Sequence, residues 1–269
     1  MKRILLSLLF VAVAVAIQAQ DAAGVLSLAR RVNDYFVAQN PDPTKPTFVK
    51  KKRTSNLWTR AVYYEGLMDL YSVDPDKRYL EYTDRWGVYH KWTARGSVDD
   101  TNADNQCCEQ TYIDRFAATG DSVMIAPTTE NLNHQMATGR KNYWWWIDAI
   151  QMAMPVYAKY AKISGDRHYL DYAMDCYRVV RDRRGLFNSA DGLWWRDSVY
   201  KAPYKEPDGK NCYWSRGNGW VYAALVRVMK TVDADDPYYK ELLKDYLLMT
   251  HALVKLQRRD GYWNASLVS

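Results

Sequence analysis

The chain has 269 residues, 48% of them hydrophobic and 25% charged, a globular balance that allows one large core. The formal net charge of +6 is small and scattered, which argues against a nucleic-acid partner and is compatible with an anionic ligand. Eleven Trp and 22 Tyr accompany only five Phe. Trp and Tyr suit stacking on sugar rings, although a helical core that uses these residues explains the composition equally well.

The first residues are typical of a secretory signal peptide. Lys2 and Arg3 precede an almost continuous apolar run over residues 4–17, which is too short to span a bilayer comfortably. Cleavage after Ala16 or Ala19 would leave a signal peptide over 1–19 and one domain over 20–269. No later run reaches transmembrane length, so we expect an exported protein, periplasmic or extracellular, that is free of the membrane after cleavage. The oligomeric state is left open.

Helical periodicity dominates the rest of the chain. The basic run at 50–53 is interpreted as a solvated loop. The Gly- and Pro-containing stretch 183–213 is the one long irregular region, and a short hairpin is expected within it. Apolar residues at helical spacing predict nine helices, over roughly 22–38, 57–72, 77–92, 104–118, 122–136, 145–164, 167–182, 217–231 and 236–257.

A weak internal repeat indicates that these helices form a regular array. Segments 72–82, 163–172 and 233–242 each contain an Asp-bearing turn followed by a Tyr-Leu or Tyr-Tyr pair. The Asp is suited to cap the next helix, and the aromatic pair to pack inward. Repeated helix pairs form either an open solenoid or a closed toroid. The unequal repeats and the long loops with Trp clusters favour a closed α/α barrel.

Two carboxylates stand at the predicted starts of helices. Asp104 begins the helix over 104–118, where the helix dipole favours an ionised carboxylate, but a simple N-cap would look the same. Asp148 follows Trp144, Trp145 and Trp146 and opens an otherwise apolar helix. Apolar burial should raise the pKa of Asp148, as a general acid near neutral pH requires. A capping Asp beside core Trp residues is the alternative.

The segment 213–221 is the most specific local pattern in the chain. Gly217 and Gly219 allow a sharp turn and a close approach of the backbone to a ligand. Arg216 offers a planar fork for a carboxylate, and Trp214 and Trp220 offer stacking faces. A Gly-rich helix cap would explain the glycines but not the combination of Arg, Asn and two Trp.

No metal or cofactor site is expected. The cysteines Cys107, Cys108, Cys176 and Cys212 have no metal-ligand spacing and are interpreted as small buried residues, with a Cys176–Cys212 bridge left open. The His residues show no metal-ligand spacing either, and the chain has no phosphate loop, nucleotide fingerprint or Ser nucleophile elbow.

Taken in order, the segments around Asp104, Asp148 and 214–220 resemble glycoside hydrolase family 105 and its relative family 88, the unsaturated rhamnogalacturonyl and glucuronyl hydrolases. The resemblance extends from Trp58 to Trp263. It implies an all-α (α/α)6 barrel of twelve helices. It also implies a metal-free reaction on an anionic oligosaccharide of pectin-type or related origin, in which the C4–C5 double bond of a terminal unsaturated uronic acid is hydrated.

The resemblance also implies roles for individual residues. Asp148 would be the general acid and then the base, and Asp104 would hold or polarise the substrate. The expected substrate-binding residues are Arg216, Trp214, Asn218, Trp220, Trp146 and Trp195.

Two features depart from the family pattern. Residues 192–197 lack the His that many relatives carry there, so the linkage or the leaving sugar is expected to differ from the pectin case. Nine predicted helices against twelve predict a barrel without its last helices. The alternatives are a non-catalytic glycan-binding protein on the same fold and another α/α-toroid enzyme, an epimerase or a lyase. The identities of the uronic acid and the leaving sugar are not indicated.

Overall fold

The structure, a computed structural model, describes residues 22–269, so the predicted signal peptide over 1–19 lies outside the described residues. Two short antiparallel hairpins accompany the helices. One pairs β1 (Thr47–Val49) with β2 (Lys51–Arg53), and the other pairs β3 (Phe187–Asn188) with β4 (Leu193–Trp194). The helices are 22–39, α2 (Trp58–Val73), α3 (Lys77–Tyr89), α4 (Ala103–Gln106), α5 (Glu109–Thr119), η1 (Ser122–Met124), α6 (Ala126–Ala137), α7 (Asp148–Ser164), α8 (His168–Arg178), η2 (Val179–Arg183), α9 (Ser215–Met229) and α10 (Pro237–Leu256).

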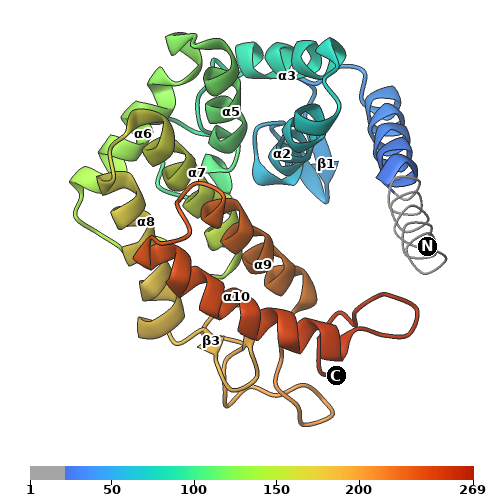
Figure 1. Cartoon of the computed structure of the whole chain (residues 1–269), viewed down its shortest axis with the longest axis vertical. Helices are drawn as coiled ribbons and strands as arrows, with labels where there is room; N and C mark the ends of the chain where they lie inside the picture. Colours follow the sequence, from blue (N-terminus) through green and yellow to red (C-terminus); the bar gives the residue numbers. More distant parts are fainter. Residues whose placement is uncertain (1–21) are drawn as a thin grey trace, which may run out of the picture.

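The helices are arranged as an arc of two layers (Figure 1). Helices α3, α6, α8 and α10 follow one another along the outside, and α2, α7 and α9 lie on the inner side. Helix α7 packs against α4, α5, α8 and α9, and α5 packs against α2. Contacts between charged side chains show that α2, α5, α7 and α9 run in the same direction. Arg227 near the end of α9 reaches Asp69 near the end of α2, and Lys159 of α7 reaches Asp114 of α5.

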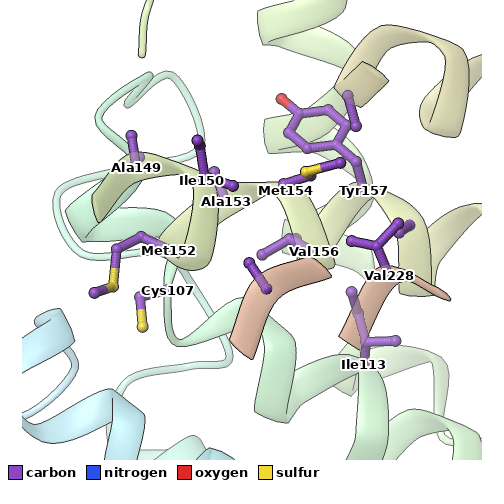
Figure 2. Packing of buried hydrophobic residues seen from close by; sticks show 14 of the residues in the cluster. Cys107, Ile113, Ala149, Ile150, Met152, Ala153, Met154, Val156, Tyr157 and Val228 are labelled. Atoms are coloured by element: carbon purple, nitrogen blue, oxygen red, sulfur yellow. The ribbon is translucent and has the colours of Figure 1, made fainter. Parts of the chain in front are cut away.

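Helix α7 is the centre of the core. Its residues from Asp148 to Ala158 are all buried, so it is apolar on nearly every side, as expected for a helix enclosed by others. Figure 2 shows the side chains of α7 together with Cys107, Ile113 and Val228 from neighbouring segments. Within residues 22–269, no helix is long and apolar enough to cross a membrane.

A buried carboxyl group joins the inner helices. Glu65 of α2 is 2% exposed, and its Oε2 accepts a hydrogen bond from Gln151 Nε2 of α7 at 2.8 Å. Its Oε1 accepts one from Gln110 Nε2 of α5 at 3.1 Å and one from Cys107 Sγ at 3.1 Å. Arg227 of α9 completes the cluster with an ion pair of 3.7 Å. This Glu65 cluster therefore fixes the relative positions of α2, α5, α7 and α9.

All nine predicted helical regions contain helix. The helix expected over 104–118 is interrupted at Cys107 and Cys108, so α4 and α5 are separate. The helix expected from residue 145 begins at Asp148, because Trp146 forms an antiparallel bridge with Asp197 instead. The basic run interpreted as a loop is a hairpin, in which Lys50 adopts the left-handed conformation (φ 60°) and β2 follows. The hairpin expected within 183–213 is present as β3 and β4.

The cysteines agree with the interpretation as small residues without a bridge. Cys107, Cys108 and Cys176 are buried, Cys212 is partly buried, and all four are free. The open possibility of a Cys176–Cys212 disulfide is therefore not realised.

Candidate active site

The candidate residues meet where the inner helices begin. Asp104 lies in the first turn of α4, Asp148 is the first residue of α7, and Arg216 lies in the first turn of α9. Trp58 opens α2, and the Arg216 guanidinium lies 5.9 Å from its ring centre. Because the inner helices run in parallel, one end of the array collects these N-termini and their partial positive charges. Such an end favours an anionic ligand.

The Asp148 carboxyl group is buried, and burial favours its protonated form. It is 7% exposed, and its Oδ2 atom is buried without a hydrogen-bond partner. Burial raises the pKa of Asp148, and the negative charge of Asp197 adds to this effect. The nearby Arg196 and Arg216 oppose the rise in pKa. Burial thus favours the protonated form, whereas the positive charges of Arg196 and Arg216 would stabilise the carboxylate after the proton is transferred.

Asp104 is close enough to Asp148 for their charges to interact. Burial, followed by repulsion from Asp148, raises the pKa of Asp104 to about 6, and Arg53 opposes this. Asp104 is not the N-cap that was considered as the alternative, and the helix dipole expected to favour its carboxylate is small. Asn102 is the cap, since its side chain accepts a bond from the Asp104 N–H, and α4 has only four residues to supply a dipole. The two carboxyl groups repel each other, so they carry fewer than two negative charges at mildly acidic pH.

The guanidinium group of Arg216 packs against aromatic rings. Its guanidinium lies 4.4 Å from the ring centre of Trp214, and Trp58 packs edge-on against Trp220 at 6.4 Å. Arg216 is exposed and forms no salt bridge within the part of the chain that the structure describes. The fork of Arg216 is therefore free to bind an oxyanion, and neighbouring ring faces are partly accessible.

The segment after β4 brings a second arginine to Asp148. The Ile147 N–H donates to the Arg196 carbonyl at 3.0 Å, and Trp146 pairs with Asp197 in the same bridge. Arg196 Nη1 contacts Asp197 Oδ2 at 2.9 Å. Trp146, expected in the substrate site, is 7% exposed and stacks at a tilt on the half-exposed Trp145.

Two expected substrate-binding residues have other positions. Asn218 is fully buried, and its amide bonds to the backbone: Oδ1 accepts from the Trp194 N–H, and Nδ2 donates to the Trp194 and Trp214 carbonyls. It holds β4 against α9 instead of facing a ligand. Trp195 is 8% exposed and packs on Tyr213 in a small separate cluster, because successive residues of a strand face opposite sides.

Sequence reasoning missed four residues of this region: Trp58, Arg53, Arg196 and Asp197. Arg196 and Asp197 lie in the segment 192–197 that was already noted for its departure from the family pattern. Arg53 was part of a basic run with no sign of what it would contact. Within residues 22–269, no group of three or more His, Cys, Asp or Glu side chains is placed to hold a metal ion.

Residues 28–269 match the sequence profile of Glycosyl Hydrolase Family 88. The chain belongs to this family.

Two curated relatives named unsaturated 3S-rhamnoglycuronyl hydrolase are similar to it. The protein of Formosa agariphila is 28% identical over 79% of this chain and 60% of its own length. The protein of Alteromonas sp. (strain LOR) is 27% identical over 90% of this chain and 64% of its own length. The chain thus spans less than two thirds of either relative.

Solved structures agree with the fold. A family 88 glycosyl hydrolase from Bacteroides vulgatus is 30% identical and superposes with a TM-score of 0.81, over 91% of this chain and 71% of that chain. A protein named polysaccharide lyase is 28% identical, with a TM-score of 0.83 over 92% of this chain and 71% of that chain. The predicted all-α fold of the α/α-toroid type is confirmed.

Proposed function

We propose that this protein is a glycoside hydrolase that removes a terminal 4,5-unsaturated uronic acid from an oligosaccharide by hydrating its C4–C5 double bond. The observation that carries the proposal is the pair of Asp148 and Asp104 at the meeting point of the inner helices, with a free Arg216 beside them. Family membership and the names of the two curated relatives support the same reaction class.

In the proposed mechanism, protonated Asp148 gives its proton to C4, and positive charge develops at C5 and the ring oxygen. Water then adds to C5 and returns a proton to the Asp148 carboxylate, which restores the acid. The C5 hemiketal opens, C1 becomes a hemiacetal, and this hemiacetal releases the neighbouring sugar as an alcohol. One water is consumed. Asp104 would hold or polarise a substrate hydroxyl.

Arg216 is proposed to bind the uronate carboxylate through its planar fork, with the Trp214 and Trp220 rings forming part of the wall of the sugar site. The relatives' names favour rhamnose as the sugar next to the uronic acid, in place of the pectin-type sequence. The apolar run at residues 4–17 supports the proposal that the protein is exported, to the periplasm or the medium, where such oligosaccharides are produced.

The test is the ultraviolet absorbance of the unsaturated uronate during incubation with unsaturated uronyl disaccharides. Hydration removes the conjugated double bond, so the wild-type protein should lower the absorbance and Asp148→Asn should not. Asp235→Asn is the matched control, because Asp235 is exposed on the turn before α10 and contacts neither Asp104 nor Asp148.

Other outcomes would point to other functions. A rise in absorbance from an intact polyuronide would indicate a lyase, the name given to one structural neighbour. Binding of the disaccharides without any change in absorbance would favour a glycan-binding protein. Equal turnover by wild type and Asp148→Asn would contradict the proposed acid.

A further inference from the structure

The β1–β2 hairpin is anchored beside Asp104. Arg95 connects the two segments: its Nε donates to Thr54 Oγ1 at 3.1 Å, and its Nη1 donates to Asn105 Oδ1 at 3.0 Å. The Arg95 N–H also donates to the Asn105 carbonyl at 3.1 Å. Thr54 directly follows Arg53, and Asn105 directly follows Asp104. This clamp therefore holds the end of β2, with Arg53, next to the start of α4.

The residues after the hairpin are fixed as well. Ser55 is buried, and its hydroxyl lies 2.7 Å from His90 Nε2, while its carbonyl accepts a bond from Trp86 Nε1 at 3.1 Å. Asn56 is also buried. The base of the hairpin is thus part of the packed structure, so the position of Arg53 is set before any ligand arrives.

Arg53 acts on Asp104 through its charge but does not form an ion pair with it. It forms no salt bridge in the described residues 22–269, and its Nε atom is buried without a hydrogen-bond partner. Its side chain is only partly exposed, in contrast to the exposed Lys51 and Lys52 of the same strand. A buried guanidinium donor is costly to leave unpaired, so an oxyanion that accepted a bond from it would be stabilised.

The cations of the site divide between the two carboxyl groups. Arg196 and Arg216 act on Asp148, whereas Arg53 acts on Asp104. One uronate carboxylate can occupy the fork of one arginine. With Arg216 assigned to that carboxylate and Arg196 paired with Asp197, Arg53 is the cation near the acid pair that has neither a salt bridge within the described residues nor an assigned substrate group.

We propose that Arg53 is a specificity-determining residue that binds a second anionic group of the substrate, a sulfate ester or a carboxylate on the leaving sugar. This inference rests on the proposed hydrolase activity, because it places the unsaturated uronate at Asp148 and Arg216. It defines the preferred substrate as at least a dianion. The planar guanidinium can offer two parallel N–H groups to either oxyanion, and these bonds are charge-assisted.

The experiment compares three unsaturated uronyl disaccharides that differ in the leaving sugar: neutral rhamnose, rhamnose sulfate monoester, and a uronic acid. The readout is the ratio of kcat/KM for each anionic substrate to kcat/KM for the neutral one, so an equal effect on all three substrates cancels. We expect wild type to prefer at least one anionic substrate by about tenfold to a hundredfold, the range of one charge-assisted pair. The larger ratio identifies sulfate or carboxylate as the group.

Arg53→Met keeps the aliphatic stem of the side chain and should reduce this ratio to about one. Arg53→Lys should keep part of it, because the charge stays but the fork is lost. Lys51→Met is the matched control, since Lys51 is exposed on the same strand, and it should leave the ratio at the wild-type value. An undiminished ratio in Arg53→Met would overturn the inference, and so would an equal loss in Lys51→Met or a wild-type ratio near one.

A binding measurement separates this inference from the proposed activity. Titration with methyl rhamnoside sulfate and with methyl rhamnoside, followed by NMR, needs no turnover. Tighter binding of the sulfate to wild type than to Arg53→Met would support the anion site even if no disaccharide is hydrolysed. Equal binding to both proteins, together with equal turnover ratios, would reject it.

Discussion

The carboxyl group of Asp104 should lower the stability of the folded protein at neutral pH. Burial and the charge of Asp148 raise the pKa of Asp104 from 3.8 to about 6. A group with a raised folded pKa contributes stability that is fully present below the unfolded pKa and is lost as the pH rises through the folded pKa. The window for Asp104 therefore runs from about pH 4 to about pH 6. Above it, the folded state contains a carboxylate that would be better solvated in the unfolded chain.

The magnitude follows from the two pKa values. The difference between 3.8 and about 6 corresponds to about 3 kcal/mol at about 1.4 kcal/mol per pKa unit. Asp104 is only partly buried, so solvent screening reduces this to about 1–2 kcal/mol. Asp104→Asn removes the ionisable group and should therefore stabilise the protein by about this amount at pH 8. At pH 4 the charge-dependent part of the stability difference should be small.

The assay is urea unfolding of wild type and Asp104→Asn at pH 4, 6 and 8, with Asp235→Asn as the control at an exposed site. The decisive quantity is how the stability difference changes between pH 4 and pH 8, because the amide contributes a constant offset at every pH. A difference that is independent of pH would refute the reasoning, since it would mean that the Asp104 carboxylate is not destabilised in the folded state.

Three further predictions concern the same residues and their supports. Asp148→Asn should lower the pKa of Asp104, because the neighbouring negative charge that adds to its rise is removed; an NMR titration of the Asp104 carboxyl group shows this, and an unchanged pKa counts against the pair. Glu65→Ala should destabilise the fold by about 3–5 kcal/mol and Glu65→Gln by clearly less, as measured by urea unfolding; similar losses would mean that the buried bonds contribute little. Asn218→Ala should cost about 2 kcal/mol and reduce kcat more than it raises KM, because Asn218 positions Trp194 and Trp214; a pure KM effect would indicate direct contact with substrate.

The sequence was sufficient for the helices and for the way in which they come together. Periodicity depends on side chains that face one core, and that information is local, so each predicted helical region is found. The interruption between α4 and α5 was not predictable. Cys107 and Cys108 are both fully buried, and no local spacing indicates that a helix turns there. Asp104 consequently sits on a short helix capped by Asn102, with a raised pKa.

The errors at Trp195 and Asn218 have a different origin. The face that a strand residue occupies depends on its register, and a shift by one residue would exchange Trp194 and Trp195. That register is fixed by Asn218, which lies 24 residues away from Trp194 along the chain. A residue of the motif itself thus determines which Trp enters the core, and only the folded structure reveals the link. Arg53 was missed for the same reason, since Arg95 sets its position through contacts distant in sequence.

The position of the site at the starts of the inner helices follows from the core beneath it. The Glu65 cluster fixes α2, α5, α7 and α9 relative to one another, so the first residues of these helices are placed with little freedom. An acid that must hold a proton and then lose it needs burial on one side and cations on the other. Burial of Asp148 comes from the apolar start of α7, whereas the cations come from two other segments, Arg216 from the first turn of α9 and Arg196 from the residues after β4. The core thus raises the pKa of the acid, and Arg216 and Arg196 determine which anionic substrate can bind beside it.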